Sequence, residues 1–446
     1  MAQTDSSTLD ARLASLLPRS MVEEVARARG VVQRQRKVDV YALVWTLVLG
    51  FQTGSARTIE ALRGAYQRVS SHNLARSAFY DRLTAELAMT LRQLAVGAMD
   101  SLGGKASTPQ GYLAGFRDLL AIDSTVLQLH DWLSKEYGAT RTNSTKASAK
   151  LHMVMSVLDG SPRRVKLTPE RTNDRTPWRK VGRWVEGRLL LFDLGYFSYS
   201  LFDRIDHNNG YFLSRLKANA NPLIVDVHRR WRGRSIVVAD RRLRDVMGSL
   251  RREILDVEAR VEFDRRSYRG KRSRARRTFR VIAIRNHESG EYHVYVTNVP
   301  PDKLAAEDIT RTYALRWQVE LLFKAMKTHG HLDQLPSRKK CVVECLVWAS
   351  VLSLLASQAL YRLIRSLLDP DRALPLLRWA SKFAEIAGDL LTMVLTPNPE
   401  EERKKRRYLL YNAPDPNRNR EDRALDPILG ITQHSSAILG VTVCGS

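Results

Sequence analysis

Hydrophobic residues recur at helical spacing in the first hundred residues of the chain. The repeat is clearest over 38–49, 55–69 and 77–99, where apolar positions fall every three or four residues. Glycine- and serine-containing breaks separate these runs, and a further glycine-rich stretch follows near residue 105. The pattern predicts a helical N-terminal part over residues 1–108.

From residue 111 onward, short apolar runs replace the helical repeat. One run contains Asp123, and a second run, 189–192, ends at Asp193. The segment 151–167 predicts two strands around an Asp-Gly turn, and 211–217 predicts another strand. Strand, hairpin, helix, strand, helix and strand in this order indicate an α/β domain with a mixed sheet. The polar stretch between the hairpin and residue 185 is expected to be an irregular helix.

Residues 219–292 interrupt this order, so we expect the α/β domain to comprise 111–218 and 293–366. The interruption predicts an all-β insertion, and the last of its expected strands leads into the second half of the domain. Helical spacing returns after residue 300, and a helical C-terminal region with a poorly ordered tail is expected over 367–446. The strands expected from the insertion are 235–242, 258–266, 277–286 and 291–299.

A polar stripe marks the otherwise apolar helix predicted over 313–327. Tyr313, Arg316, Glu320 and Lys327 fall within about 60° of arc on one helical face. A local ion pair explains part of the stripe, because Arg316 and Glu320 are four residues apart. A functional site explains it equally well at this point, so both interpretations stay open.

The charge of the chain favours a polyanionic partner. The 446 residues carry a formal net charge of +25, and arginine dominates the excess. Three cysteines without a CxxC pair fit a reducing cytoplasm and no disulfide framework. The apolar run 341–360 is long enough to cross a bilayer, but its polar residues favour a buried core helix, so no membrane is expected.

Two aspartates in apolar strands, Asp123 and Asp193, need a common explanation, since a buried unpaired carboxylate is costly. Pairing with arginines is one explanation. A hard divalent cation such as Mg²⁺, held by both aspartates and a glutamate from a helix, is the other. Other carboxylates nearby rank lower because of their expected positions in turns or on exteriors: Asp118, Asp159, Glu170, Asp203 and Asp206.

The stripe and the two aspartates together resemble a known family. The string Y-x2-R-x3-E-x6-K at 313–327, the string Asp-x-Gly-Tyr at Asp193 and the Asp123 strand are similar to the D-D-E transposases of bacterial insertion sequences, family four. The resemblance covers roughly 111–366 and implies an RNase H-like catalytic core. It further implies that Asp123, Asp193 and Glu320 hold two Mg²⁺ ions, which Mn²⁺ could replace.

The resemblance also implies contacts with DNA. Tyr313, Arg316 and Lys327 would contact phosphates of the transposon end, and Lys324 is added to this group. Relatives can carry a tryptophan late in the insertion that stacks on a flipped base. This chain has none there, and Tyr292, His293 and Tyr295 occupy the region. A basic, aromatic-bearing run in the insertion favours phosphate binding by Arg269, Lys271, Arg272 and Arg274.

The expected function is therefore cleavage of inverted-repeat ends and joining of the freed 3′-OH to target DNA, by a homodimer acting on double-stranded DNA near the bacterial nucleoid. Cut-and-paste is the expected route. The helical N-terminal part would bind DNA, with an ordinary helical bundle as the alternative. Two other functions stay open: an RNase H-like nuclease without end specificity, and a DNA-binding regulator whose catalytic site has decayed.

Overall fold

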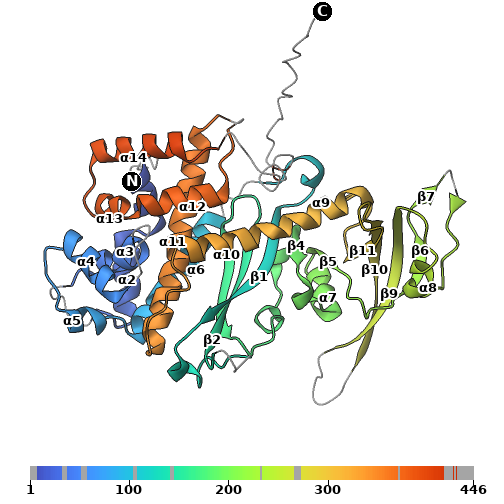
Figure 1. The fold of residues 1–446 in the computed structure, drawn as a ribbon, viewed down its shortest axis with the longest axis horizontal. Helices are drawn as coiled ribbons and strands as arrows, with labels where there is room; N and C mark the ends of the chain where they lie inside the picture. The colour runs from blue at the N-terminus through green and yellow to red at the C-terminus, as the bar shows by residue number, and fades with distance from the viewer. Residues whose placement is uncertain are drawn as a thin grey trace, which may run out of the picture.

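The fold is built from one large sheet with a helical body at one end (Figure 1). The structure is a computed structural model. It describes residues 8–32, 38–51, 58–103, 108–140, 145–231, 234–265, 273–369 and 372–415, together with Leu425 and Ile428. The predictions made for Arg269, Lys271, Arg272 and the tail after residue 428 lie outside these ranges.

Nine strands form one mixed sheet in the order β3-β2-β1-β4-β5-β11-β10-β9-β6. The pairs β1/β4 and β4/β5 are parallel, and the remaining neighbours are antiparallel. The strands are β1 (Asp118–Gln128), β2 (Ser148–Ser156), β3 (Pro162–Pro169), β4 (Arg188–Phe192), β5 (Tyr211–Arg215), β6 (Leu223–Val227), β9 (Ile254–Asp264), β10 (Arg274–Arg285) and β11 (Tyr292–Thr297). A separate ribbon pairs β7 (Arg230–Trp231) with β8 (Arg234–Ser235).

The burial of β1 changes along its length. Its first five residues are buried on both faces, as expected for a strand with a parallel neighbour. From Thr125 onward, buried and exposed residues alternate, so one face of the strand meets solvent. Asp123 lies at this transition, where a charged side chain can be anchored and still reach the surface.

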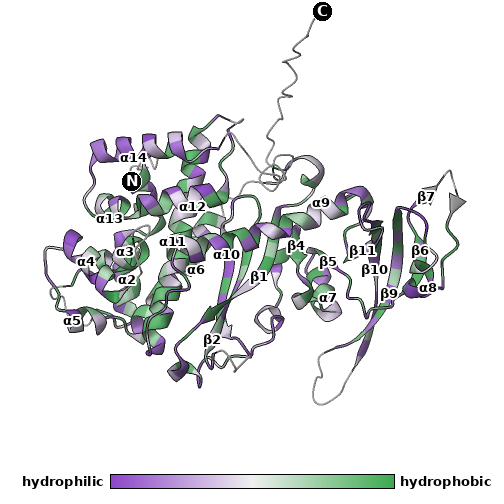
Figure 2. Cartoon of the chain, in the orientation of Figure 1, coloured by the Kyte–Doolittle hydropathy of each residue, from purple (hydrophilic) through white to green (hydrophobic). Residues whose placement is uncertain are grey.

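The helices before and after the sheet domain pack together as one body around α11 (Lys340–Leu367). Their buried residues share a hydrophobic core with one face of the sheet. Figure 2 shows α14, on the outside, mainly in the hydrophilic colour. The N-terminal helices are α1 (Leu9–Leu16), α2 (Arg19–Ala28), α3 (Val40–Leu49), α4 (Ile59–Val69), α5 (Arg76–Tyr80) and α6 (Ala85–Gly103). After α11 come α12 (Leu376–Glu385), α13 (Ala387–Leu395) and α14 (Pro399–Asn412).

The mixed α/β sheet and the helical N- and C-terminal parts are confirmed. In the part of the chain that the structure describes, α11 is the one helix long and apolar enough to cross a membrane, and 89% of its most apolar window is buried inside the protein. It is therefore explained as the central helix of the helical body.

The insertion differs from its prediction in two respects. Its strands β6, β9 and β10 continue the nine-stranded sheet, because β11 pairs with β5, and they cover a second core on the other face. It also contains a short helix, α8 (Leu243–Met247), so it is not all-β. The strand predicted over 235–242 is mostly absent, and β6 was missed.

The prediction of a helix with irregular ends before residue 185 is wrong. That stretch contains only the 3-10 turns η3 (Thr176–Trp178) and η4 (Arg183–Val185). Pro169 and Pro177 explain the difference, because proline removes a backbone donor and restricts the residue before it.

The helix predicted over 313–327 is present but interrupted. It consists of α9 (Ile309–Ala314), the 3-10 turn η7 (Leu315–Trp317) and α10 (Gln318–Thr328). Figure 1 shows this rod lying across the sheet, with α10 over β1. The interruption falls at Arg316, the residue that reaches toward β1.

Candidate active site

The two aspartates are brought together by the parallel pairing of β1 and β4. Ile122 pairs with Phe192, so the next residue on each strand, Asp123 and Asp193, lies at the same edge of the sheet. Asp193 ends β4 and precedes the turn η5 (Leu194–Tyr196), where its carboxylate accepts a hydrogen bond of 3.5 Å from the Gly195 N–H. The strand ends thus explain the positions of both carboxylates.

Arg316 joins Glu320 to Asp123. Its Nη2 lies 2.8 Å from Glu320 Oε1 and its Nη1 lies 3.5 Å from Asp123 Oδ2. The Arg316 side chain is only 13% exposed, and its Nε has no hydrogen-bond partner in the described structure. The ion pair expected from the sequence is therefore present, and it forms part of a larger group rather than an isolated surface contact.

The pKa of Asp123 is raised by its surroundings in this group. Burial is the main cause that raises its pKa to about 6. The Asp193 and Glu320 carboxylates also act to raise the pKa, and the Ser124 N–H and Arg316 act to lower it. A carboxyl group held at this pKa would gain from an added positive charge. The surroundings of Asp123 are therefore suited to binding a cation.

An open cleft of about 410 Å³ begins at these carboxylates. Lys327 lies along it, with Nζ 3.3 Å from the carbonyl oxygen of Val126 on β1, and Lys324 is exposed. The cleft thus has an acidic end and a basic end. Its lining residues are Asp123, Ser124, Thr125, Glu320, Phe323, Lys324, Lys327 and Thr328.

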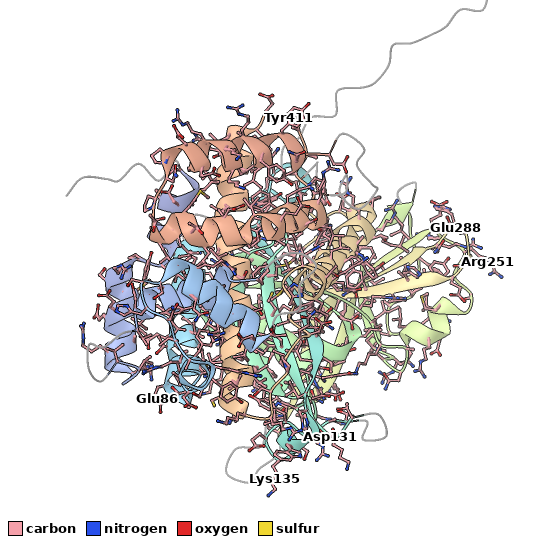
Figure 3. The ribbon with its side chains drawn as sticks, turned by 60° about the vertical axis from the view of Figure 1, so that its left-hand side comes forward. Glu86, Asp131, Lys135, Arg251, Glu288 and Tyr411 are labelled. Carbon is pink, nitrogen blue, oxygen red and sulfur yellow. The ribbon has the colours of Figure 1, made fainter. Side chains whose placement is uncertain are left out.

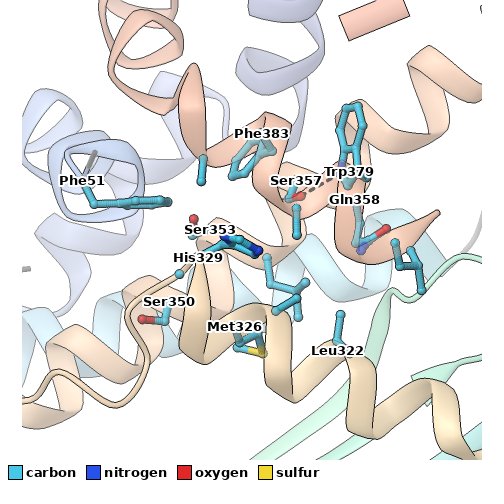
Figure 4. Close-up of a pocket in the computed structure, with 16 residues that line it drawn as sticks. Phe51, Leu322, Met326, His329, Ser350, Ser353, Ser357, Gln358, Trp379 and Phe383 are labelled. Atoms are coloured by element: carbon cyan, nitrogen blue, oxygen red, sulfur yellow. Dashed lines mark hydrogen bonds between the residues drawn. The ribbon is translucent and has the colours of Figure 1, made fainter. Parts of the chain in front are cut away.

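The opposite side of α10 is apolar. A small cavity of about 40 Å³ separates it from α11 and α12, with Leu322, Met326 and Phe383 among its lining residues (Figure 4). Burial of this face fixes the rotation of α10, and therefore points Glu320 and Lys327 toward β1.

A polar layer behind Asp123 was not foreseen from the sequence. His152 on β2 pairs in register with Ser124, and its Nδ1 lies 3.2 Å from the Tyr196 hydroxyl and its Nε2 2.9 Å from Thr168 Oγ1. Burial lowers the pKa of His152 to about 4, so the ring is neutral at physiological pH. Only Tyr196 carried a sequence signal, as the tyrosine of Asp-x-Gly-Tyr.

The other carboxylates are occupied elsewhere. Asp118 pairs with Arg163, Asp159 with Arg362, and Asp203 with Arg277. Glu170 accepts from the Thr140 N–H and Asp206 from the Asn298 amide. Their lower rank as site residues agrees with these structural partners.

Within the part of the chain that the structure describes, the carboxylates near Asp123 do not form a closed metal site. Among the described residues, no three His, Cys, Asp or Glu side chains lie close enough to hold one ion together as they stand. The donors themselves are hard carboxylate oxygens, which suit Mg²⁺ or Mn²⁺. Such a cation fits the carboxylate oxygens of Asp123, Asp193 and Glu320, and it would reduce the repulsion between their negative charges. In the structure, Arg316 supplies a positive charge between Asp123 and Glu320.

The remaining predicted residues are not all at the cleft. Arg274 lies in the β9–β10 hairpin, 3.7 Å from Glu262 and 3.9 Å from Asp264. Tyr313 is half-buried and packs edge-on against Tyr295, with ring centroids 5.3 Å apart.

The three candidates for base stacking differ in accessibility. Tyr295 is only 2% exposed, so its ring is not free to stack on a base. The hydroxyl of Tyr292 donates to the Arg252 carbonyl oxygen at 2.6 Å, and His293 is half-buried. Of the three, His293 and Tyr292 are the more accessible.

The fold and the cleft together define a mixed α/β protein with carboxylates at adjoining strand ends, faced by a helix that also carries cations. Comparison with known proteins then gives the family. A family model described as "Transposase DDE domain" matches residues 114–356, which is more than half of the chain. The chain belongs to this family and is a DDE transposase, related to insertion-sequence transposases.

Three named transposases of insertion sequences and one solved structure are similar to this chain. The transposase for insertion sequence element IS231E of Bacillus thuringiensis subsp. finitimus is 21% identical over 380 residues, covering 79% of this chain and 80% of that protein. The IS231B transposase of subsp. berliner is 22% identical over 386 residues, with 79% and 80% covered. A putative transposase InsL for IS186A of Escherichia coli (strain K12) is 33% identical over 81 residues, 18% of this chain and 22% of that one. A solved piggyBac transposase synaptic complex with hairpin DNA has a TM-score of 0.45 at 10% identity, covering 94% of this chain and 88% of that one.

Proposed function

We propose that this transposase binds the inverted-repeat ends of its own insertion sequence, cleaves them by metal-dependent hydrolysis and joins the freed 3′-OH to target DNA. The observation that carries the proposal is the convergence of Asp123, Asp193 and Glu320 through the β1/β4 register and Arg316. We take the half-sheet β3-β2-β1-β4-β5 as the RNase H-like catalytic core.

Asp123, Asp193 and Glu320 would hold two Mg²⁺ ions, or Mn²⁺ in their place. Bound there, the ions would activate the attacking oxygen and stabilise the leaving one. Water adds to the scissile phosphorus and releases a 3′-OH and a 5′-phosphate. In the second step the 3′-OH adds to a target phosphorus and displaces the target's 3′-oxygen, so the number of phosphodiester bonds is conserved.

Arg316 would exchange partners during this process. In the structure it neutralises Asp123 and Glu320, and its Nε has no described partner. A DNA phosphate beside these two carboxylates would give the guanidinium a third acceptor, which it can bind in a bidentate manner. Arg316 then positions the strand rather than reading its sequence.

The lysines along the cleft also support DNA as the molecule that binds there. Lys324 and Lys327 lie on the α10 side of the cleft, and Tyr313 lies one turn before Arg316. We propose that they contact phosphates of the transposon end, and that the N-terminal helices and the basic β9–β10 hairpin, including Arg274, bind DNA further along.

The route is proposed as cut-and-paste by a homodimer that synapses two ends. If a base is flipped during a hairpin step, His293 and Tyr292 are the residues of β11 that could stack on it, because Tyr295 is buried.

The test is Mg²⁺-dependent nicking of duplexes that carry the inverted repeats bracketing the coding sequence. We expect wild-type protein to nick at the repeat boundary, and Asp193→Ala and Glu320→Ala to lose nicking while still binding the duplex. Asp203→Asn is the matched control, because Asp203 lies on α7 (Tyr199–His207) and pairs with Arg277 on β10, away from the cleft. Nicking that survives both alanine variants would contradict the site.

The same assay separates the two alternative functions. Equal cleavage of any duplex would indicate an RNase H-like nuclease without end specificity. Tight end binding by wild type with no cleavage in Mg²⁺ or Mn²⁺ would indicate a DNA-binding regulator.

A further inference from the structure

An exposed tryptophan lies beyond the catalytic end of β1. Trp132, in the 3-10 turn η2 (Asp131–Leu133), is 70% exposed. Figure 3 labels its neighbours Asp131 and Lys135 at the lower tip of the molecule. A large indole held in solvent contributes little to the core, and tryptophan is enriched at interfaces because its ring offers a large apolar area together with a polar N–H.

Two cations and a second aromatic ring accompany Trp132. The Arg338 guanidinium carbon lies 4.5 Å from the centre of the Trp132 ring, and Lys339 Nζ lies 4.7 Å from the centre of the Tyr80 ring. Both cations are exposed, and neither forms a salt bridge with a carboxylate of the described chain. We call Trp132, Arg338, Lys339 and Tyr80 the Trp132 surface.

The Trp132 surface lies further along the chain from the β1 residues that line the cleft. Lys327 contacts the Val126 carbonyl oxygen, and Val126 itself is 39% exposed on β1 between Asp123 and the turn. A strand rises about 3.3 Å per residue, so the turn lies roughly 17–30 Å from Asp123. At its other end the surface reaches α5, since Tyr80 belongs to that helix and its hydroxyl lies 3.5 Å from Ser337 Oγ.

The geometry points to the transposon-end duplex as the occupant: we propose that the Trp132 surface binds it about five to nine base pairs inside the cleavage point, at about 3.4 Å per base pair. This inference rests on the proposed function, in which Lys324 and Lys327 contact that same end. The duplex would then run from the carboxylates, along β1, to the N-terminal helices.

The side chains suit a duplex contact. Arg338 and Lys339 would bind phosphates, and the Trp132 ring would lie against sugars and base edges in the minor groove. The formal net charge of +25 favours a polyanion over an acidic peptide of limited length. Cations that form no salt bridge within the described residues, next to an exposed ring, are what this partner requires.

The experiment compares two end duplexes, one with about 20 base pairs and one with about 4 base pairs of repeat inside the cleavage point. We expect Trp132→Ala to bind the long duplex about tenfold more weakly than wild type. Trp132→Ala should bind the short duplex as well as wild type does. The affinity of Trp132→Phe for the long duplex should lie between those of wild type and Trp132→Ala. Arg338→Gln should also lower the slope of log affinity against log salt by about 0.9, the share of one phosphate contact.

Matched controls come from the opposite side of the protein. Tyr411 on α14 is 80% exposed and is labelled at the top of Figure 3, and Arg407 is an exposed cation on the same helix. Tyr411→Ala and Arg407→Gln should bind both duplexes as wild type does. An unchanged melting temperature of Trp132→Ala would exclude a folding defect.

Equal binding of the long duplex by Trp132→Ala and wild type would overturn the inference, and so would a loss that depends on the length of DNA outside the cleavage point. Neither result affects nicking by wild type, so the proposed function would stand. Failure of wild type to bind any end would overturn the proposed function first.

Discussion

Two groups in this protein pair an arginine with carboxylates, and they differ in whether every nitrogen of the arginine has a partner. On β9 and β10, Arg280 forms two hydrogen bonds with Asp256, at 2.8 and 2.7 Å, and its third nitrogen donates to the carbonyl oxygens of Val299 and Leu304. Both side chains are at most 5% exposed. This pair is buried, and each guanidinium nitrogen of Arg280 has a hydrogen-bond partner.

The group around Arg316 is incomplete by comparison. One guanidinium serves Asp123 and Glu320, its Nε has no partner in the described structure, and Asp193 adds a further negative charge. The Glu320 side chain is 33% exposed. The β9–β10 pair is therefore a structural pair, whereas under the proposed function the Arg316 group keeps charge available for a cation and a phosphate.

The largest expected difference is in activity. Glu320→Gln keeps the size of the side chain and the Arg316 contact but removes the charge, so we expect Mg²⁺-dependent nicking to fall by about 10³-fold or more. The free energy of unfolding should change by no more than about 1 kcal/mol, because the site is partly exposed. Nicking rates and urea denaturation of the same preparation measure both, and a variant with normal nicking would contradict the comparison.

Asp256→Ala should show the opposite profile. It leaves Arg280 buried without its carboxylate, and we expect a loss of about 3–5 kcal/mol in the free energy of unfolding. In the double variant Asp256→Leu/Arg280→Met, apolar packing replaces the pair, and much of the stability should return. If Asp256→Ala were as stable as wild type, the Arg280–Asp256 pair would not contribute to the stability of the fold.

Asp123→Asn should stabilise the protein in a pH-dependent way. The pKa of Asp123 is raised from 3.8 to about 6, so the unfolded chain releases this proton near pH 4 while the folded chain retains it to about pH 6. The free energy of unfolding of wild type therefore falls as pH rises through this window. At pH 7–8 the variant should be more stable by up to about 3 kcal/mol, and the gain should vanish below pH 4. Denaturation curves at several pH values test this, and a gain independent of pH would refute the assigned cause.

The smallest effect is expected for an exposed ion pair. Arg274 is 74% exposed beside Glu262 and Asp264, so Arg274→Ala should change the free energy of unfolding by about 0.5 kcal/mol or less. Thermal denaturation in low salt measures it. A loss above 2 kcal/mol would show that exposure is not what separates the weak pairs from the strong ones.

The sequence singled out three carboxylates, which the structure places at adjoining strand ends and on the facing helix, but it did not show what surrounds them. Asp123 and Asp193 stand out because each interrupts or ends an apolar run, and Glu320 because it shares a helical face with Arg316. His152 and Tyr196 could not be placed, since their contact depends on the registers of β2 and β4 against β1, which local pattern does not specify. The 3-10 turn at Arg316 was likewise missed, because helical periodicity alone assumes a regular α-helix.

For the architecture too, local features could be predicted and long-range pairing could not. Periodicity predicted the helical N- and C-terminal parts and most strands, because burial dictates those patterns. It did not show that the insertion extends the main sheet, since the pairing of β11 with β5 joins residues about 80 positions apart. The short β6 was missed because Asp226 interrupts its apolar pattern.

The measurement that tests the central claim most directly is a metal-specificity switch at Asp193. Asp193→Cys replaces a hard oxygen with a softer thiolate, which Mn²⁺ accepts better than Mg²⁺. If Asp193 holds the catalytic metal, this variant should not nick inverted-repeat ends in Mg²⁺ and should regain measurable nicking in Mn²⁺, whereas Asp193→Ala should regain none. Equal activity of the cysteine variant in both metals, or equal rescue of the alanine variant by Mn²⁺, would contradict the assignment of Asp123, Asp193 and Glu320 as the metal-binding site.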